Sequence, residues 1–189
     1  METITLTQLQ NIMPSARARF SKRRDSKSRA EVFLPYLQQF MEEYGITSPI
    51  SMSYFLATIA VESAELRFTE EIASGVAYEG RKDLGNKKPG DGVRYKGRGL
   101  IQLTGYNNYK EYSTAVGFDF YSTTAKAKGL AQPGNAVRSA CWFWWKHDLN
   151  TIAAEDNPIR IRKIVNGGLN GYPLFLQYVD KAKSVLMFK

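Results

Sequence analysis

The chain has 189 residues, of which 43% are hydrophobic and 23% charged, a balance typical of one globular domain and not of a disordered chain. Its single cysteine, Cys141, excludes an internal disulfide, and with a single histidine, His147, a zinc site would need carboxylate ligands as well. The formal net charge of +8 favours an anionic partner.

Apolar residues recur at helical spacing along most of the chain, which predicts a mainly α fold. Gly45 is expected to stop the second helix, and Ser51 or Ser53 to cap the start of the third. The segments with helical spacing are 5–14, 30–46, 48–63, 106–116, 133–149, 157–166 and 173–188.

Much of the positive charge is local. Between Arg17 and Arg29, seven basic residues face Asp25 alone, which gives this segment a charge of +6. Such a stretch favours nucleic acid, a lipid surface or an acidic polymer such as a bacterial envelope, and the alternative is a solvated loop that keeps the protein soluble. The basic residues are Arg17, Arg19, Lys22, Arg23, Arg24, Lys27 and Arg29.

The segment 75–105 is rich in glycine and contains a Lys-Lys-Pro-Gly turn signal. It is expected to form a loop with at most short strands, near Tyr95 and at 100–104. With no internal repeat and no linker long enough to separate domains, the sequence predicts a single α-rich domain with a glycine-rich loop, or short β insertion, beside a cleft.

The third predicted helix carries Glu62 on the face that Phe55 and Ile59 mark as buried. Both burial and the negative end of the helix dipole disfavour a charged carboxylate there, so Glu62 is expected to keep its proton as a general acid does. The alternative is a structural salt bridge, for instance to Arg67 or Arg81. With one histidine in the chain, catalysis is expected to rest on carboxylates.

Glycoside hydrolysis needs a second carboxylate. If the helix ran on, Glu71 would lie ~13.5 Å along the axis from Glu62, roughly half a turn round. An inverting enzyme needs about 6.5–9.5 Å between its carboxyl groups, so this pair requires the helix to end soon after Ser63. The candidates are Glu65, which is too close to leave room for water, and Glu70, Glu71 and Glu79.

Polar side chains are concentrated just after the glycine-rich segment. In an extended chain Gln102 and Thr104 would point the same way. These amide, hydroxyl and phenol groups suit sugar hydroxyls and N-acetyl groups, whereas a phosphate-binding loop is not favoured because no Gly-Lys-Ser/Thr follows. The neighbouring groups are Tyr106, Asn107, Asn108 and Tyr109.

Several motifs together resemble glycoside hydrolase family 19, which includes chitinases and, with a closer likeness, compact bacteriophage endolysins and prophage lysozymes. The similarity covers roughly 50–180, and the N-terminal part also resembles the helical lead-in of those endolysins. The motifs are "AVESAELRFTEE", "YEGRKDLGN", "GDGVRYKGRG", "QLTGYNNY" and "IVNGGLNGY".

This resemblance implies a lysozyme-like, two-lobed, mainly α fold with a cleft, and hydrolysis with inversion of β-1,4 bonds next to N-acetylated sugars. Carried over by position, Glu62 matches the general acid, Glu71 the general base and Thr104 the hydroxyl that helps to hold the attacking water. The positions implied to contact substrate are Gln102, Asn108, Tyr109, Asn166, Tyr78 and Arg81.

The sequence departs from the family pattern at two positions. Val61 stands where many members have a histidine before the catalytic glutamate, which leaves the surroundings of the acid more apolar. Phe175 stands where many members carry an arginine after the Asn-Gly-Gly motif. No arginine is then available at that position to orient the second carboxylate.

The expected function is that of a peptidoglycan-cleaving endolysin of the muramidase type. It would be a monomer with one catalytic domain over 1–189 (a helical lead-in over 1–49 and a family-19-like core over 50–189), with no separate wall-binding domain and no metal or organic cofactor. The alternatives are a chitinase acting on chitin oligomers, a wall-binding module without activity and, least favoured, a nucleic-acid binder.

The start of the chain shows no signal peptide, and no apolar run approaches the ~20 residues of a membrane span. The protein is therefore expected to be made in the host bacterial cytoplasm and to act on the wall from the periplasm after release. The segment 17–29 and the C-terminal helix are expected to contact an anionic envelope or lipopolysaccharide.

Overall fold

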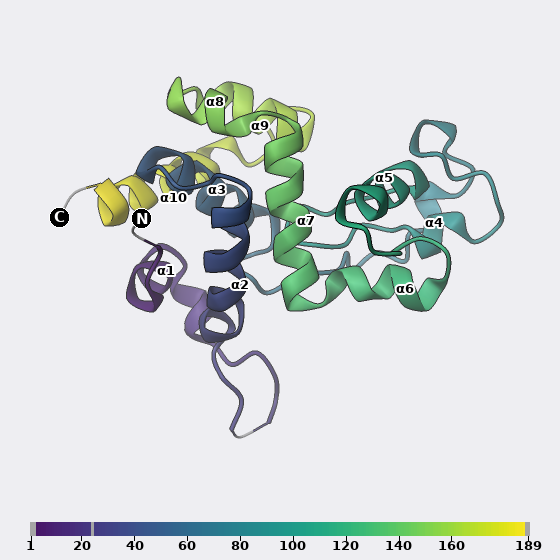
Figure 1. Ribbon diagram of the computed structural model, residues 1–189, viewed down its shortest axis with the longest axis horizontal. Coiled ribbons are helices and arrows are strands. Elements are labelled where there is room, and N and C mark those ends of the chain that lie inside the picture. Colours follow the sequence, from purple (N-terminus) through teal and green to yellow (C-terminus); the bar gives the residue numbers. More distant parts are fainter. Residues whose placement is uncertain (1–2, 24, 188–189) are drawn as a thin grey trace.

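The computed structural model describes residues 3–23 and 25–187, and it is mainly α (Figure 1). Short 3-10 turns at Pro14–Arg17, Val76–Tyr78, Lys82–Leu84 and Gly129–Ala131 join the helices. The helices are α1 (Leu6–Ile12), α2 (Arg29–Glu43), α3 (Pro49–Glu62), α4 (Asp91–Arg94), α5 (Tyr106–Val116), α6 (Thr124–Lys128), α7 (Pro133–Lys146), α8 (Leu149–Ala154), α9 (Pro158–Asn166) and α10 (Tyr172–Met187).

The helix that carries Glu62 starts earlier than predicted. The N-cap of α3 is Ser48, whose side chain accepts a hydrogen bond from the amide of Ser51, so the expectation of a cap at Ser51 or Ser53 is wrong. The reason is Pro49, whose fixed φ and missing N–H suit the first helical position. The predicted stop at Gly45 is confirmed, since this residue adopts a left-handed φ of 70° just after α2.

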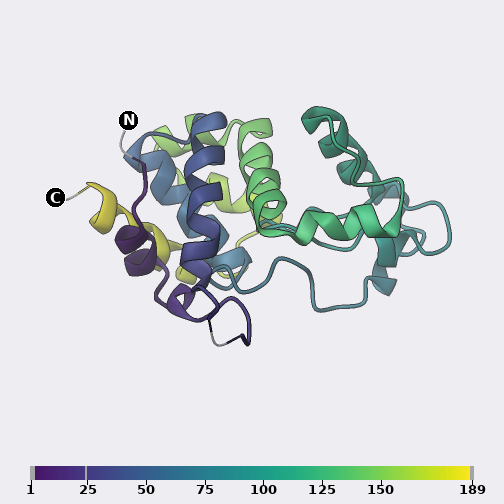
Figure 2. The ribbon, with the colours of Figure 1, turned by 60° about the horizontal axis from the view of Figure 1, so that its bottom comes forward.

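The helices surround two hydrophobic clusters. The larger one joins α1, α2, α3, α8, α9 and α10, so the predicted parts 1–49 and 50–189 share one core. The smaller one joins α5, α6 and the adjoining loops. Helix α7 lies between the two groups in both views (Figures 1 and 2), and it places Trp144 in the larger cluster and Trp142 in the smaller.

The expected short β insertion is wrong. Within the described residues the glycine-rich segment contains only isolated bridges, between Glu70 and Arg98 and between Arg98 and Leu103. Gly99 and Gln102 have φ values of 89° and 54°, so the chain turns back on itself where the sequence suggested an extended segment. Gln102 and Thr104 therefore do not alternate along a strand.

Three short helices, α4, α6 and α8, lie outside the helical segments predicted from spacing. The predicted helix 133–149 ends at Lys146, because Asp148 has a φ of 51° and α8 starts afresh at Leu149. Across 3–23 and 25–187, no helix is long and apolar enough to cross a membrane.

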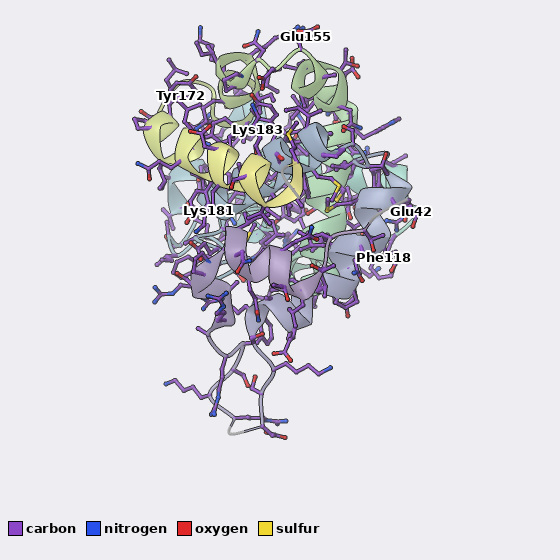
Figure 3. The ribbon with its side chains drawn as sticks, turned by 90° about the vertical axis from the view of Figure 1, so that its left-hand side faces the viewer. Glu42, Phe118, Glu155, Tyr172, Lys181 and Lys183 are labelled. Carbon is purple, nitrogen blue, oxygen red and sulfur yellow. The ribbon has the colours of Figure 1, made fainter. Side chains whose placement is uncertain are left out.

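The basic segment forms a loop that extends from the body below α2 (Figures 1 and 3). A bridge between Arg19 and Ser28 closes it, and the amide of Phe20 donates to the carbonyl of Lys27 at 2.9 Å. Arg24 lies outside the described residues. Arg29 is half-buried, and the remaining basic side chains of this loop are exposed: Arg17, Arg19, Lys22, Arg23 and Lys27.

Candidate active site

Glu62 is the last residue of α3, a helix whose residues from Ser51 to Ala60 are all buried. The side chain of Glu62 itself is 20% exposed. The predicted position at the end of an apolar helix is therefore confirmed. The carboxylate of Glu62 therefore lies at the edge of the larger hydrophobic cluster.

The carboxylate of Glu62 is paired with Arg162, from α9, and not with Arg67 or Arg81 as suggested from the sequence. Arg162 is only 4% exposed, and its Nε donates to the carbonyl of Asn170 at 2.9 Å. The salt bridge that the sequence analysis gave as the alternative is therefore present, with a different partner, and a buried guanidinium fixes Glu62 in place.

The guanidinium of Arg162 also lies over the ring of Phe175, 5.9 Å from its centroid. Phe175 is the residue that replaces an arginine in the family pattern. A guanidinium is therefore still present at this place in the fold, although it comes from α9 and contacts Glu62.

Helix α3 ends at Glu62, as a pairing with Glu71 would require, and a left-handed turn follows. Ala64, Glu65 and Leu66 adopt left-handed φ values of 48°, 56° and 65°. The hydroxyl of Ser63 accepts a hydrogen bond from the amide of Leu66 at 2.8 Å. Non-glycine residues in this conformation cost of order 1–3 kcal/mol each and gather at functional sites.

Glu71 lies on the loop that follows, held by neutral donors. Its Oε2 accepts from the amide of Gly97 at 3.1 Å, and its Oε1 accepts from the hydroxyl of Tyr78 at 3.0 Å. Burial, together with this hydrogen bond to Glu71, raises the pKa of Tyr78. Tyr78, predicted to contact substrate, therefore orients the candidate base.

Gly97 brings Glu71 next to Gln102. A Cβ at this position would stand 2.8 Å from Oε1 of Gln102 and 3.2 Å from Oε2 of Glu71, closer than side-chain packing normally allows. Only glycine lets the backbone pass between the two side chains.

The other carboxylates considered are engaged elsewhere. Glu70 pairs with Lys96 at 3.0 Å and with Arg98 at 3.2 Å. Burial raises the pKa of Glu70, but these two cations outweigh it and the pKa is lowered. Glu65 is buried among neutral donors, and Glu79 accepts from the amide of Gly90 at 3.2 Å.

Three of the predicted residues line one pocket of about 170 Å³: Gln102, Thr104 and Asn108. They are linked, because the hydroxyl of Thr104 donates to the carbonyl of Gln102 at 2.8 Å and the amide of Asn108 donates to the carbonyl of Thr104 at 2.7 Å. The hydroxyl proton of Thr104 is thereby used, and its oxygen is left to accept a hydrogen bond.

Tyr109 was predicted to contact substrate, and this is wrong. Its side chain is 0% exposed. Its hydroxyl donates to the carbonyl of Lys96 at 2.7 Å and accepts from Arg98 at 3.1 Å. Tyr109 belongs to the smaller cluster and supports the loop that carries Gly97.

Arg81 and Asn166 are placed outside this pocket. The guanidinium of Arg81 forms two hydrogen bonds with Asp83 on an exposed loop. Asn166 donates to the carbonyl of Asn170 at 3.2 Å, the same carbonyl that accepts from Arg162. Asn166 therefore supports the arginine that pairs with Glu62.

The sequence did not indicate the part of the pocket wall that comes from the end of α7. Phe143, Lys146 and His147, at the end of α7, line it. The ring of His147 lies 4.3 Å from that of Phe143, and burial, then the charge of Lys146, lower the pKa of His147. Helical periodicity put these residues on α7, but nothing in the sequence showed that the end of this helix lines the same pocket as Thr104.

Part of the chain is similar in sequence to a family 19 glycosyl hydrolase domain. No family model matches the chain. Over 105 residues, 53% of this chain, it is 36% identical to a Haemophilus influenzae protein named "Glycosyl hydrolase family 19 domain-containing protein". The match covers 47% of that protein, so the chain spans about half the length of this relative.

Among solved structures, chitinase C from Streptomyces griseus HUT6037 aligns with a TM-score of 0.72 at 18% identity, over 97% of this chain and 76% of the other. The class IV family 19 chitinase from Zea mays aligns with a TM-score of 0.70 at 15% identity, over 98% and 94%. The protein is a mainly α single domain with the fold of the family 19 chitinases. Its matched segment resembles a family 19 glycosyl hydrolase domain.

Proposed function

We propose that the protein is a glycoside hydrolase that cleaves the β-1,4-linked glycan of bacterial peptidoglycan with inversion. The observation that carries the proposal is the contrast between two carboxylates: Glu62 is fixed by the buried Arg162, and Glu71 is held by neutral donors beside the pocket that contains Thr104. Inverting hydrolysis uses two carboxyl groups, and each of these is held in a fixed position by its partners.

In the proposed reaction Glu62 donates a proton to the leaving glycosidic oxygen as the bond from that oxygen to the anomeric carbon breaks. Arg162 stabilises the carboxylate that proton transfer leaves behind. Glu71 takes a proton from a water molecule whose oxygen forms the new bond to the anomeric carbon from the opposite face. The free oxygen lone pairs of Thr104 accept a hydrogen bond from that water.

Charge favours peptidoglycan over chitin as the substrate. The net charge of +8 and the exposed cations of the 17–29 segment suit an anionic polymer, whereas chitin is neutral. The motifs that resemble bacteriophage endolysins support the same choice, with action on the wall from the periplasm after release from the cytoplasm. Because the solved structures named above are chitinases, chitin oligomers are the second candidate.

The test is digestion of purified Gram-negative peptidoglycan and of chitin hexamer, with mass spectrometry of the products, for the wild type and Glu62→Gln. Fragments ending in reducing N-acetylmuramic acid, lost in the variant, would establish a muramidase. Fragments ending in reducing N-acetylglucosamine would make it a glucosaminidase with the same acid. Binding to the wall without release of fragments would favour a non-catalytic wall-binding module.

A further inference from the structure

A second pocket, of about 620 Å³, is lined in part by the turn that follows Glu62. Val61 and Ala64, which flank Glu62 closely in the chain, form part of its wall, together with Leu174 from α10. Figure 3 looks onto α10, with the basic 17–29 loop extending below it. Ala18 and Arg29 also line the pocket, so it lies between the chain next to Glu62 and the two ends of the basic loop.

The one carboxylate that lines this pocket is already satisfied. Glu65 is 8% exposed, and it accepts hydrogen bonds from the amide of Ser15 and from the hydroxyl of Tyr178. Burial, together with this bond, raises the pKa of Tyr178, which keeps its hydroxyl as a donor. Glu65 is thus a structural anchor between η1 and α10.

Two arginines, Arg29 and Arg67, also line the pocket. Within the part of the chain that the structure describes, neither is among the residues that form ion pairs within 4.0 Å. The Nε of Arg29 is buried and has no hydrogen-bond partner. Another nitrogen of the Arg29 guanidinium donates a hydrogen bond to the carbonyl of Ser15, which carries no net charge.

The two guanidinium groups also repel each other. Burial and the charge of Arg67 lower the pKa of Arg29, and the charge of Glu65 offsets this only in part. Two like charges that share a pocket without an ion-pair partner destabilise the empty protein, and this is the arrangement expected where an anion binds.

We propose that this pocket binds carboxylates of the acidic peptide that peptidoglycan carries on its muramic acid, and that it selects peptide-bearing glycan over chitin. This inference rests on the proposed function. The peptide branches from a sugar next to the scissile bond, and the pocket adjoins the turn after Glu62. The peptide of a glycan bound at Glu62 would therefore lie near the pocket. Chitin has no carboxylate to offer, so the two arginines contribute nothing to its binding.

The test uses two substrates: soluble glycan strands with their peptides, and stripped strands without them. For the stripped strands, an amidase removes the peptides, and the lactyl carboxylates that this exposes are then coupled to methylamine to give neutral amides. Arg67→Gln and Arg29→Gln are compared with Arg160→Gln, a control that removes an exposed arginine paired with Glu155 on α9. Each of the two pocket variants is expected to lose about tenfold in kcat/KM, mainly through KM, on peptide-bearing strands, the scale of a charge-assisted hydrogen bond. On stripped strands they should match the control.

Arg67 is exposed, so Arg67→Gln keeps the proposal testable if Arg29→Gln fails to fold. Equal losses on both substrates would overturn the proposal, because the arginines would then be structural. Unchanged rates on both substrates would also overturn the proposal. So would an inhibition by lipopolysaccharide that is seen with the wild type and lost in the two arginine variants, since phosphate would then be the ligand of the pocket. A wild type that cleaves neither substrate would instead overturn the proposed function.

Discussion

Glu62 and Arg162 form the contact on which the proposed chemistry depends most closely. Arg162 is held to the carbonyl of Asn170, so its guanidinium stays in place when its partner changes. Removing one member of a buried pair leaves the other as an uncompensated charge. Stability and activity are therefore coupled at this pair.

Arg162→Gln is expected to lower the free energy of unfolding by about 2 kcal/mol, because Glu62 loses its partner at a site only partly open to water. In a Glu62→Gln background the same change should cost much less. Chemical denaturation of the four proteins of this cycle measures the coupling. Effects that add within about 0.5 kcal/mol would show that the two side chains do not interact.

Gly97 sets the distance between the candidate base and the pocket. In Gly97→Ala the new Cβ would displace Glu71 and Gln102, so kcat is expected to fall by roughly tenfold to a hundredfold. Gly129→Ala is the matched control, since its Cβ would meet only Phe120 at 3.8 Å. Activity of Gly97→Ala equal to that of the control would remove Glu71 from the catalytic site.

At the scale of elements, the turn after α3 decides whether the second carboxylate can approach the first. The end of the helix followed only as a condition, since an uninterrupted helix would separate Glu62 from Glu71. The turn itself was not predictable, because a left-handed helix end normally shows as a glycine and this one uses Ala64, Glu65 and Leu66.

Ala64→Gly is expected to raise the free energy of unfolding by about 1 kcal/mol, because glycine adopts the left-handed conformation without strain. Ala115→Gly, at an exposed position in the last turn of α5, should instead lower it by up to about 1 kcal/mol. Thermal or chemical unfolding of both variants compares the signs. A loss of stability in Ala64→Gly would mean that this turn carries no strain.

The candidate site was only partly predictable, because it is completed by contacts between helices that are distant in the sequence. Helical spacing located α3, α5, α9 and α10, and motif resemblance located Glu71 and Thr104. Neither showed that Arg162 meets Glu62, because the two are separated by most of the chain and meet only when α9 packs near α3. One local signal was available: Arg162 lies four residues after Pro158 and three before Val165 on α9, so it shares a helix face with two apolar residues.

At the scale of the whole molecule, the positive charge is arranged unevenly. The 17–29 loop carries exposed cations, whereas Lys183, on the C-terminal helix, pairs with Asp156 at 2.6 Å (Figure 3). The loop is therefore a better candidate than α10 for contact with an anionic envelope. Contact between the loop and the envelope would precede binding of the glycan at the active site.

Neutralising the loop is expected to weaken killing of intact cells much more than digestion of purified wall, because only intact cells require contact with the anionic surface. The variant changes four arginines to glutamine: Arg17, Arg19, Arg23 and Arg24. A control with the same charge change elsewhere alters Lys126, Lys128, Arg160 and Lys163. Equal losses in the two assays, or equal effects of the two variants, would refute a role of the loop at the envelope.

The inverting pair of Glu62 and Glu71 is tested most directly by the configuration of the first product. Proton NMR during early cleavage of a soluble peptidoglycan oligosaccharide distinguishes the two anomers of the new reducing end before they interconvert. If Glu62 and Glu71 act as an inverting pair, the α anomer is expected to appear first from the β-linked substrate, and Glu71→Gln is expected to abolish its release. Initial formation of the β anomer would contradict an inverting pair, since retention requires a covalent intermediate and a different use of the two carboxylates.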